Sequence, residues 1–298
     1  MRNIFMFNNI FFPGLKTTNS YSVVNTIDEA DTVLIIHKIR SKQTGIKFIN
    51  EHNYQLISDA YSFAKSNNKQ LIIYCGGDRP PVILPDYDNV MVLNQSVVKS
   101  NKPTNEYVIG VPVEDKFTDF ILEPELTIGF VGQKCRGREK YLNYLENQPE
   151  LKTNFVLRDS YIHKLKSSHI NEFNNNMNNN LFTFCYRGAG NYSVRFYETI
   201  MRGRIPIVIK TDNVFPYEKL IEYDKMGIFI EESDLISQSH SGEHNKEDDC
   251  LKELILTYYN EKTKDELINI QKYNRHVYLT YFHGNSFWEQ MLNKEARL

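Results

Sequence analysis

The 298-residue sequence predicts an α/β protein made of two domains and a helical C-terminal segment. Runs of β-branched residues alternate with segments of helical spacing in two consecutive series, a pattern typical of βαβ units and parallel sheets. The length also favours two domains, because single hydrophobic cores stop growing near about 250–300 residues. We therefore expect two Rossmann-like α/β/α domains that face a cleft.

The first series predicts three strands and one helix within residues 1–112, which we expect to form the first domain. Thr32–His37 (TVLIIH) and Gln70–Cys75 (QLIIYC) are short apolar runs typical of strands buried on both faces. Between them, residues 53–66 carry apolar side chains at helical spacing. Val90–Leu93 is the third expected strand.

The second series lies in residues 126–265, which we expect to form the second domain, with residues 113–125 as the linker. Its predicted strands are Leu126–Val131, Thr153–Leu157, Leu181–Cys185 and Ile205–Ile209. Its predicted helices are Glu139–Asn147 and Ser193–Arg202. The asparagine-rich segment Asn171–Asn180 is expected to be a solvated loop. Helices within residues 266–298 are expected to cross back onto the first domain, with Trp288 as a core anchor.

Composition excludes several classes of protein. The 35 basic and 37 acidic side chains balance, so the chain lacks the global positive field of a nucleic-acid-binding protein. No apolar run reaches the roughly 18–20 residues of a transmembrane helix, so we expect at most peripheral membrane contact. The four cysteines form no CxxC pair or ligand cluster, which favours reduced, buried thiols and a cytoplasmic location.

Candidate chemistry concentrates in residues 182–217 (FTFCYRGAGNYSVRFYETIMRGRIPIVIKTDNVFPY). A predicted strand leads into a turn whose two glycines, Gly188 and Gly190, would allow close approach to a ligand and positive φ angles. The following helix begins near Ser193, and its N-terminal amides favour a phosphate. Arg195 and Glu198 lie one turn apart on this helix. The segment therefore fits a nucleotide diphosphate, although an exposed Arg–Glu helix pair would give the same spacing.

Three motifs in fixed order carry a resemblance to a known family. They are Arg187-Gly-Ala-Gly-Asn191, Arg195-Phe-Tyr-Glu198, and Gly203-Arg-Ile-Pro-Ile-Val-Ile209 followed by Thr211–Asp212. Together they resemble the signature of the exostosin family, glycosyltransferase family 47, in its compact bacterial and viral form. A looser similarity extends back to the Gly129–Gly132 strand, with Arg136, Arg138 and Arg158. The first 110 residues carry no motif of the family.

This resemblance implies a GT-B fold, with a nucleotide-sugar donor in the C-terminal domain and an acceptor in the N-terminal domain. Arg195 would neutralise the donor diphosphate, and Glu198 would hydrogen-bond the ribose. The residues expected to bind the donor are Arg136, Arg138, Arg158, Arg187, Gly188, Gly190, Asn191, Ser193, Arg195 and Glu198. Transfer would invert the anomeric centre without a metal or other cofactor, and no DxD triplet occurs in a plausible metal-binding loop.

The acceptor hydroxyl needs a general base, for which the sequence offers two candidates. Asp78 follows the second predicted strand after two glycines, and His37 ends the first. Both stand at C-terminal strand ends, where open α/β sheets bind ligands. A turn-capping aspartate and a buried, hydrogen-bonded histidine are the structural alternatives.

The sequence thus favours a glycosyltransferase that moves a sugar from a UDP- or GDP-sugar to a glycan or lipid-linked acceptor. One alternative is a fucosyltransferase-type GT-B enzyme that uses GDP-fucose. That family carries a lysine beside the helix glutamate, where this chain has Tyr197. Another alternative is a nucleotide- or glycan-binding protein that keeps Arg195 and Glu198 but lacks a working base.

Overall fold

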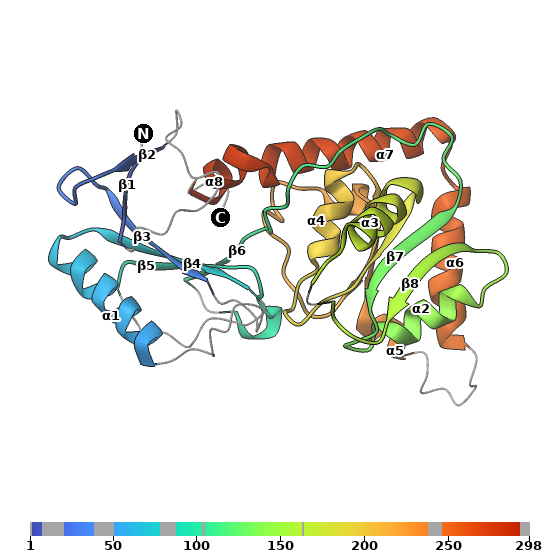
Figure 1. The fold of residues 1–298 in the computed structure, drawn as a ribbon, viewed down its shortest axis with the longest axis horizontal. Coiled ribbons are helices and arrows are strands. Elements are labelled where there is room, and N and C mark those ends of the chain that lie inside the picture. Colours follow the sequence, from blue (N-terminus) through green and yellow to red (C-terminus); the bar gives the residue numbers. More distant parts are fainter. Residues whose placement is uncertain are drawn as a thin grey trace.

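The computed structural model describes residues 2–7, 21–38, 51–77, 88–102, 105–162, 164–237 and 246–292. The chain forms two α/β domains, each with one parallel sheet, and a long C-terminal helix runs from the second domain toward the first (Figure 1). This arrangement confirms the predicted two-domain GT-B architecture. Within the described residues, no helix has the length and apolar character needed to span a membrane.

The first domain is a six-stranded sheet in the order β2-β1-β3-β4-β5-β6. The strands are β1 (Arg2–Met6), β2 (Tyr21–Val24), β3 (Thr32–Lys38), β4 (Gln70–Gly76), β5 (Val90–Asn94) and β6 (Glu106–Val108). Helix α1 (Glu51–Ser66) covers one face with Ile57, Ala60 and Ala64. The three predicted strands correspond to β3, β4 and β5, whose runs are apolar and deeply buried. Sequence reasoning missed the short β1, β2 and β6, because β2 and β6 lie at the sheet edges and β1 is only partly buried.

The second domain is a five-stranded sheet in the order β11-β10-β9-β7-β8. Its strands are β7 (Thr127–Gln133), β8 (Lys152–Arg158), β9 (Phe182–Cys185), β10 (Ile205–Lys210) and β11 (Ile228–Glu231). Its helices are α2 (Arg138–Glu146), α3 (Ser167–Asn179), α4 (Val194–Met201), α5 (Glu232–Ser237), α6 (Lys246–Asn260) and α7 (Lys264–Val277). Helices α3, α4 and α7 pack on one face of the sheet, and α2, α5 and α6 gather on the other (Figure 1).

The asparagine-rich segment is a helix, which corrects the expectation of a solvated loop over Asn171–Asn180. Most of the segment belongs to α3, and Met177 is fully buried. Asn176 donates to the Asn154 carbonyl at 2.6 Å, and Gly129 of β7 leaves the space that this packing needs. Asparagine has modest helix propensity, and here its tertiary hydrogen bonds override that preference.

The C-terminal segment returns to the first domain as predicted. After α7, a π-helical turn (Tyr278–Phe282) leads into α8 (Gly284–Leu292). Phe287 and Trp288 of α8 are buried in the core of the first domain, where the Trp288 ring lies 5.8 Å from that of Tyr74. Among the four free cysteines, Cys75 and Cys185 are buried. The other two, Cys135 and Cys250, are only half-buried, which corrects the expectation of four buried thiols.

The linker predicted at residues 113–125 runs along α7 (Figure 1). Its anchor is a two-pronged ion pair, in which Arg275 of α7 donates to both carboxylate oxygens of Asp115, at 2.8 and 2.6 Å. The Arg275 guanidinium also lies over the ring of Phe117, 4.6 Å from its centroid. Hydrogen bonding from Arg275 holds the pKa of Asp115 below its ordinary value.

We predict that Asp115→Asn lowers the free energy of unfolding by about 1–3 kcal/mol at pH 7, since a hydrogen bond to a charged group is lost. Because the folded-state pKa is depressed, this stabilisation is full above the unfolded pKa and fades as pH falls through the folded value. Urea unfolding of the wild-type protein and the variant measures the loss of stability at pH 7 and its decrease at pH 3. The exposed Asp224→Asn is the matched control, and an equal loss in both variants would contradict the role of this ion pair.

Candidate functional site

The strand order of the second domain reverses between β7 and β9. The chain leaves β7 for β8 on one side and returns through α3 to β9 on the other. In open α/β sheets, ligands bind outside the carboxyl ends of the strands at such a switch point. Two loops meet there, one from β7 to α2 and one from β9 to α4, and most of the predicted donor-binding residues lie on them or at the start of α4.

Both loops carry arginine side chains, and we call them the arginine loops. In the β7–α2 loop, Arg136 and Gly137 adopt left-handed backbone conformations, with φ of 63° and 86°. Arg138 joins the two loops, because its guanidinium donates to the Arg187 carbonyl at 3.0 Å and to the Cys135 carbonyl at 3.1 Å. Within the described part of the chain, the guanidinium groups of Arg136 and Arg187 make no hydrogen bond or ion pair. Two cations are therefore free to meet an anionic ligand at the switch point.

The β9–α4 loop carries the glycines of the RGAGN motif. A Cβ atom added at Gly188 would meet no atom within 4 Å, so the loop backbone is open to a ligand there. Neither Gly188 nor Gly190 has a positive φ, which corrects the expected reason for these glycines. Ser193 occupies the N-cap position of α4, but its hydroxyl makes no capping hydrogen bond. The loop thus offers backbone access at the N-terminus of a helix, which favours an anion.

Asn191 connects the loop to its surroundings instead of facing open space. Its side chain is buried and donates to the Val97 carbonyl at 3.2 Å and the Asp212 carbonyl at 3.1 Å. Its side-chain oxygen accepts from the Thr211 hydroxyl at 2.8 Å. Because Val97 belongs to the first domain, Asn191 ties the β9–α4 loop, called the donor loop below, to that domain.

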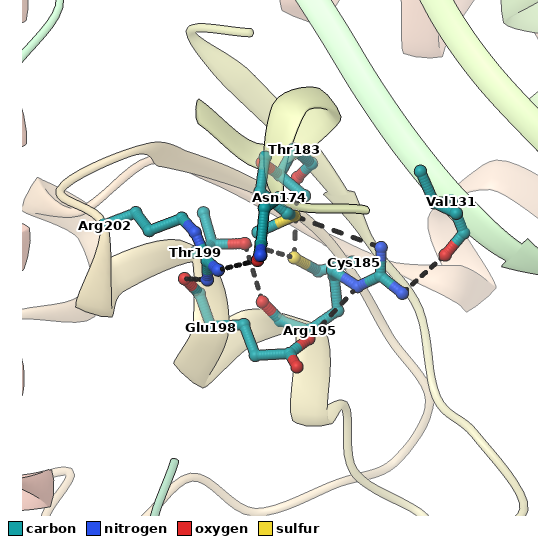
Figure 2. A network of polar contacts seen from close by, with 9 residues as sticks. Val131, Asn174, Thr183, Cys185, Arg195, Glu198, Thr199 and Arg202 are labelled. Atoms are coloured by element: carbon teal, nitrogen blue, oxygen red, sulfur yellow. Dashed lines mark hydrogen bonds and ion pairs between the residues drawn. The ribbon is translucent and has the colours of Figure 1, made fainter. Parts of the chain in front are cut away.

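Arg195 and Glu198 form an ion pair between successive turns of α4 (Figure 2). The Arg195 Nε lies 3.4 Å from a Glu198 carboxylate oxygen, and Nη2 donates to the Val131 carbonyl of β7 at 2.6 Å. The guanidinium is stacked between the rings of Phe130 and Phe173, at 5.2 and 4.7 Å from their centroids. The two side chains are only 17 % and 25 % exposed, and burial raises the pKa of Glu198 against the attraction of Arg195.

Helix α3 supplies partners that sequence reasoning missed. Arg158, expected at the phosphates, forms an ion pair with Glu172 of α3. The neighbouring Arg202 is fully buried and donates to the side-chain oxygen of Asn174 at 2.8 Å (Figure 2). It also donates to the side-chain oxygen of Asn178 at 3.1 Å. The helical spacing of Asn174 and Asn178, four residues apart, was the available signal.

A second unpredicted contact borders the arginine loops on the other face of the sheet. Glu232, at the start of α5, accepts hydrogen bonds from the hydroxyls of Tyr186 at 2.7 Å and Tyr141 at 3.0 Å. Burial raises the pKa of Tyr186, so its phenol stays protonated and donates. This contact fixes the end of β9, from which Arg187 projects.

The predicted acceptor side is described only in part. His37 lies at the C-terminal end of β3, directly beside Cys75 of β4, but its side chain lies outside the described residues. Asp78 lies outside them as well. The segment after β5 instead reaches the second domain, where an isolated bridge pairs Val98 with Asn213. The carboxyl ends of both sheets therefore face one another.

Comparison with known proteins agrees with this geometry. Residues 126–242 match the exostosin GT47 domain. This part of the chain, which forms most of the second domain, is similar to that family. The predicted resemblance is thereby confirmed, and the exostosin GT47 domain coincides with the sheet that carries the arginine loops.

Curated relatives align with about a quarter of the chain. The chain is 30 % identical over 78 residues to "Probable glucuronosyltransferase 47 A" of Physcomitrium patens, covering 26 % of this chain and 17 % of that protein. It is 27 % identical over 78 residues to a probable β-1,4-xylosyltransferase of Arabidopsis thaliana, covering 26 % and 19 %. The chain therefore spans less than a fifth of the length of these relatives.

Solved structures that align with the chain include an α1,3-fucosyltransferase and a GtfA/B complex. The first aligns over 92 % of this chain and 82 % of its own, with 12 % identity and a TM-score of 0.39. The second aligns over 89 % and 57 %, with 13 % identity and a TM-score of 0.45.

We predict that Arg195→Met lowers the free energy of unfolding by about 1–3 kcal/mol, because it leaves the partly exposed Glu198 carboxylate without its counter-charge. In the double variant Arg195→Met/Glu198→Leu, the loss should be smaller than the sum of the two single losses. Urea unfolding of the three variants measures this coupling. Additive losses would show that the two side chains do not interact.

Proposed function

We propose that the protein is a glycosyltransferase that moves a sugar from a UDP- or GDP-sugar to a glycan or lipid-linked acceptor. The observation that carries the proposal is the pair of unpartnered arginines, Arg136 and Arg187, at the switch point of an exostosin GT47 domain. An anionic ligand with two phosphates suits two guanidinium groups beside open loop backbone. A nucleotide diphosphate satisfies this requirement.

The arginines would act on the leaving group. Negative charge builds on the diphosphate as the bond to the sugar breaks, and preorganised donors stabilise this charge most in the transition state. Arg136 and Arg187 are the cations free to make this contact, while Arg138 fixes the two loops relative to each other. The amide groups at the N-terminus of α4 would add to the same field.

The family resemblance assigns the diphosphate to Arg195 and the ribose to Glu198. The pair lies beside the arginine loops, and Glu198 keeps part of its surface exposed, which supports the ribose assignment. Arg195 would stabilise the charge of the diphosphate electrostatically, without a direct hydrogen bond. Its own hydrogen bond to the Val131 carbonyl attaches α4 to β7. The transfer would invert the anomeric centre and need no metal, with Asp78 or His37 as the base.

The names of the curated relatives suggest which sugars to test first. Two are described as a probable glucuronosyltransferase and a probable β-1,4-xylosyltransferase. We therefore propose a glucuronosyl or xylosyl donor as the first candidate. The rival, a catalytically silent nucleotide-binding protein, would share the arginine loops but release no sugar.

We predict that one nucleotide in a panel of UDP, GDP, CMP and ADP raises the melting temperature. Ligand at 100 times its dissociation constant stabilises the native state by about 2.7 kcal/mol, or several degrees for a domain of this size. Arg187→Ala should remove most of this shift without lowering the melting temperature of the free protein. Lys225→Ala, which removes an exposed cation before the amino end of β11, is the control. A folded protein that responds to none of the four would refute the proposal.

We further predict that Asp78→Asn keeps the nucleotide-induced shift but lowers the transfer rate by about 10²–10⁴-fold, since a general base is lost. Release of UDP from UDP-xylose and UDP-glucuronate, with and without oligosaccharide acceptors, measures this rate. Unchanged transfer in this variant would move the base to His37, which His37→Gln then tests.

A further inference from the structure

The end of β5 makes hydrogen bonds with both domains. The tripeptide Asn94-Gln95-Ser96 is almost wholly buried although all three side chains are polar. Polar side chains are buried at little cost only when their hydrogen bonds are satisfied. Their partners come from both domains, so this tripeptide lies at the contact between the domains.

Ser96 reaches the donor loop. Its hydroxyl oxygen accepts a hydrogen bond from the backbone N–H of Asn191 at 2.8 Å. Asn191 is the residue that follows Gly190 in the RGAGN motif, so the contact acts on the loop backbone that is proposed to approach the donor. The donor loop therefore takes its position in part from the first domain.

Gln95 makes its hydrogen bonds within the first domain. Its side-chain oxygen accepts from the backbone N–H of Gly77 at 3.1 Å, and its nitrogen donates to the Tyr74 hydroxyl and the Gly110 carbonyl, both at 3.2 Å. Gly77 has a φ of 140°, a conformation that favours glycine. Adjacent residues of one strand end thus secure the turn after β4 and the donor loop.

The Ser96 hydroxyl is itself fixed in place. The Ser96 backbone N–H donates to the side-chain oxygen of Asn94 at 3.2 Å, and the Asn94 amide donates back to the Ser96 carbonyl at 3.1 Å. The same amide also donates to the buried Glu106 carboxylate at 2.8 Å. The acceptor atom offered to Asn191 is therefore preorganised and not a mobile surface hydroxyl.

We propose that Ser96 is a positioning residue for sugar transfer, which sets the donor loop in register with the acceptor-side domain. This inference rests on the proposed function. Displacement of reacting groups by about 1 Å costs up to 10²-fold in rate, so a hydrogen bond between the two halves matters more for transfer than for nucleotide binding. Other contacts, including Asn191 to Val97 and Ser100 to Asp212, keep the domains together when this bond is lost.

The proposal has a consequence that hydrogen exchange detects. A nucleotide that orders the donor loop should also order residues 94–100 of the first domain, although it binds in the second domain. Ligand binding and domain contact then stabilise each other, because coupling between two sites is reciprocal. In Ser96→Ala, the nucleotide should still protect residues 187–193 but protect residues 94–100 less than in the wild-type protein, with the Asn191–Val97 hydrogen bond left to carry the coupling.

The matched control is Ser100→Ala, which removes an interdomain hydrogen bond from the Ser100 hydroxyl to the Asp212 carboxylate, 2.5 Å long, and leaves the hydrogen bonds of Asn191 in place. We expect Ser96→Ala to lower kcat for transfer about tenfold, the effect of one lost hydrogen bond, with the donor KM changed less than twofold. Ser100→Ala should lower kcat less than twofold. The nucleotide used is whichever of UDP, GDP, CMP and ADP stabilises the wild-type protein.

Two results would overturn the inference while leaving the proposed function intact. One is nucleotide binding in the wild-type protein that protects residues 187–193 but not residues 94–100, which needs no variant. The other is a Ser96→Ala protein whose kcat and KM match those of Ser100→Ala. Failure of the wild-type protein to bind any of the four nucleotides would instead refute the proposed function, and this inference with it.

Discussion

The structure of the second domain depends on how it accommodates buried guanidinium groups. Arg195, Arg202 and Arg204 lie in the seam between α3, α4 and the sheet, where an uncompensated cation would be costly. Their compensation is mostly neutral: carbonyl oxygens of Val131 and Asp119, asparagine side chains, and the aromatic faces beside Arg195. Burial lowers the pKa of Arg204 to about 10, so even this arginine remains charged at neutral pH.

This requirement explains the composition of α3. Asn178 alone contributes a side-chain oxygen to Arg202 and a backbone carbonyl to Arg204. Neutral acceptors satisfy the geometry of a guanidinium without adding a second buried charge. Within a run that resembles low-complexity sequence, Asn174 and Asn178 are thus specific hydrogen-bond acceptors one turn apart on a helix.

The sequence was sufficient where a residue's role is decided locally. The apolar runs of β3, β4, β7 and β10 identify strands whatever surrounds them. The end of α4 was also predictable, because Gly203 supplies the left-handed φ of 65° and the paired 6→1 and 5→2 hydrogen bonds that close the helix.

Prediction stopped where the role depends on tertiary partners. Helical spacing placed Arg195 and Glu198 on one face, but whether they face a ligand or each other depends on Phe130, Phe173 and Val131, which come from other elements. The interdomain role of Asn191 was equally hidden, since its partner Ser96 lies far away in the sequence. Edge strands such as β6 gave no signal, because three residues are too few to show a period.

The path of α8 has a consequence for biosynthesis. One face of the first sheet is completed by Phe287, Trp288, Met291 and Leu292, the last part of the chain that the structure describes. A ribosome therefore releases every strand of that sheet long before the helix that covers it. The core of the second domain also takes late residues, including Leu267, Val277 and Phe282, so both sheets lie far ahead in synthesis of helices that complete their cores. Until those helices emerge, each nascent sheet carries an uncovered apolar face, the kind of surface that chaperones bind.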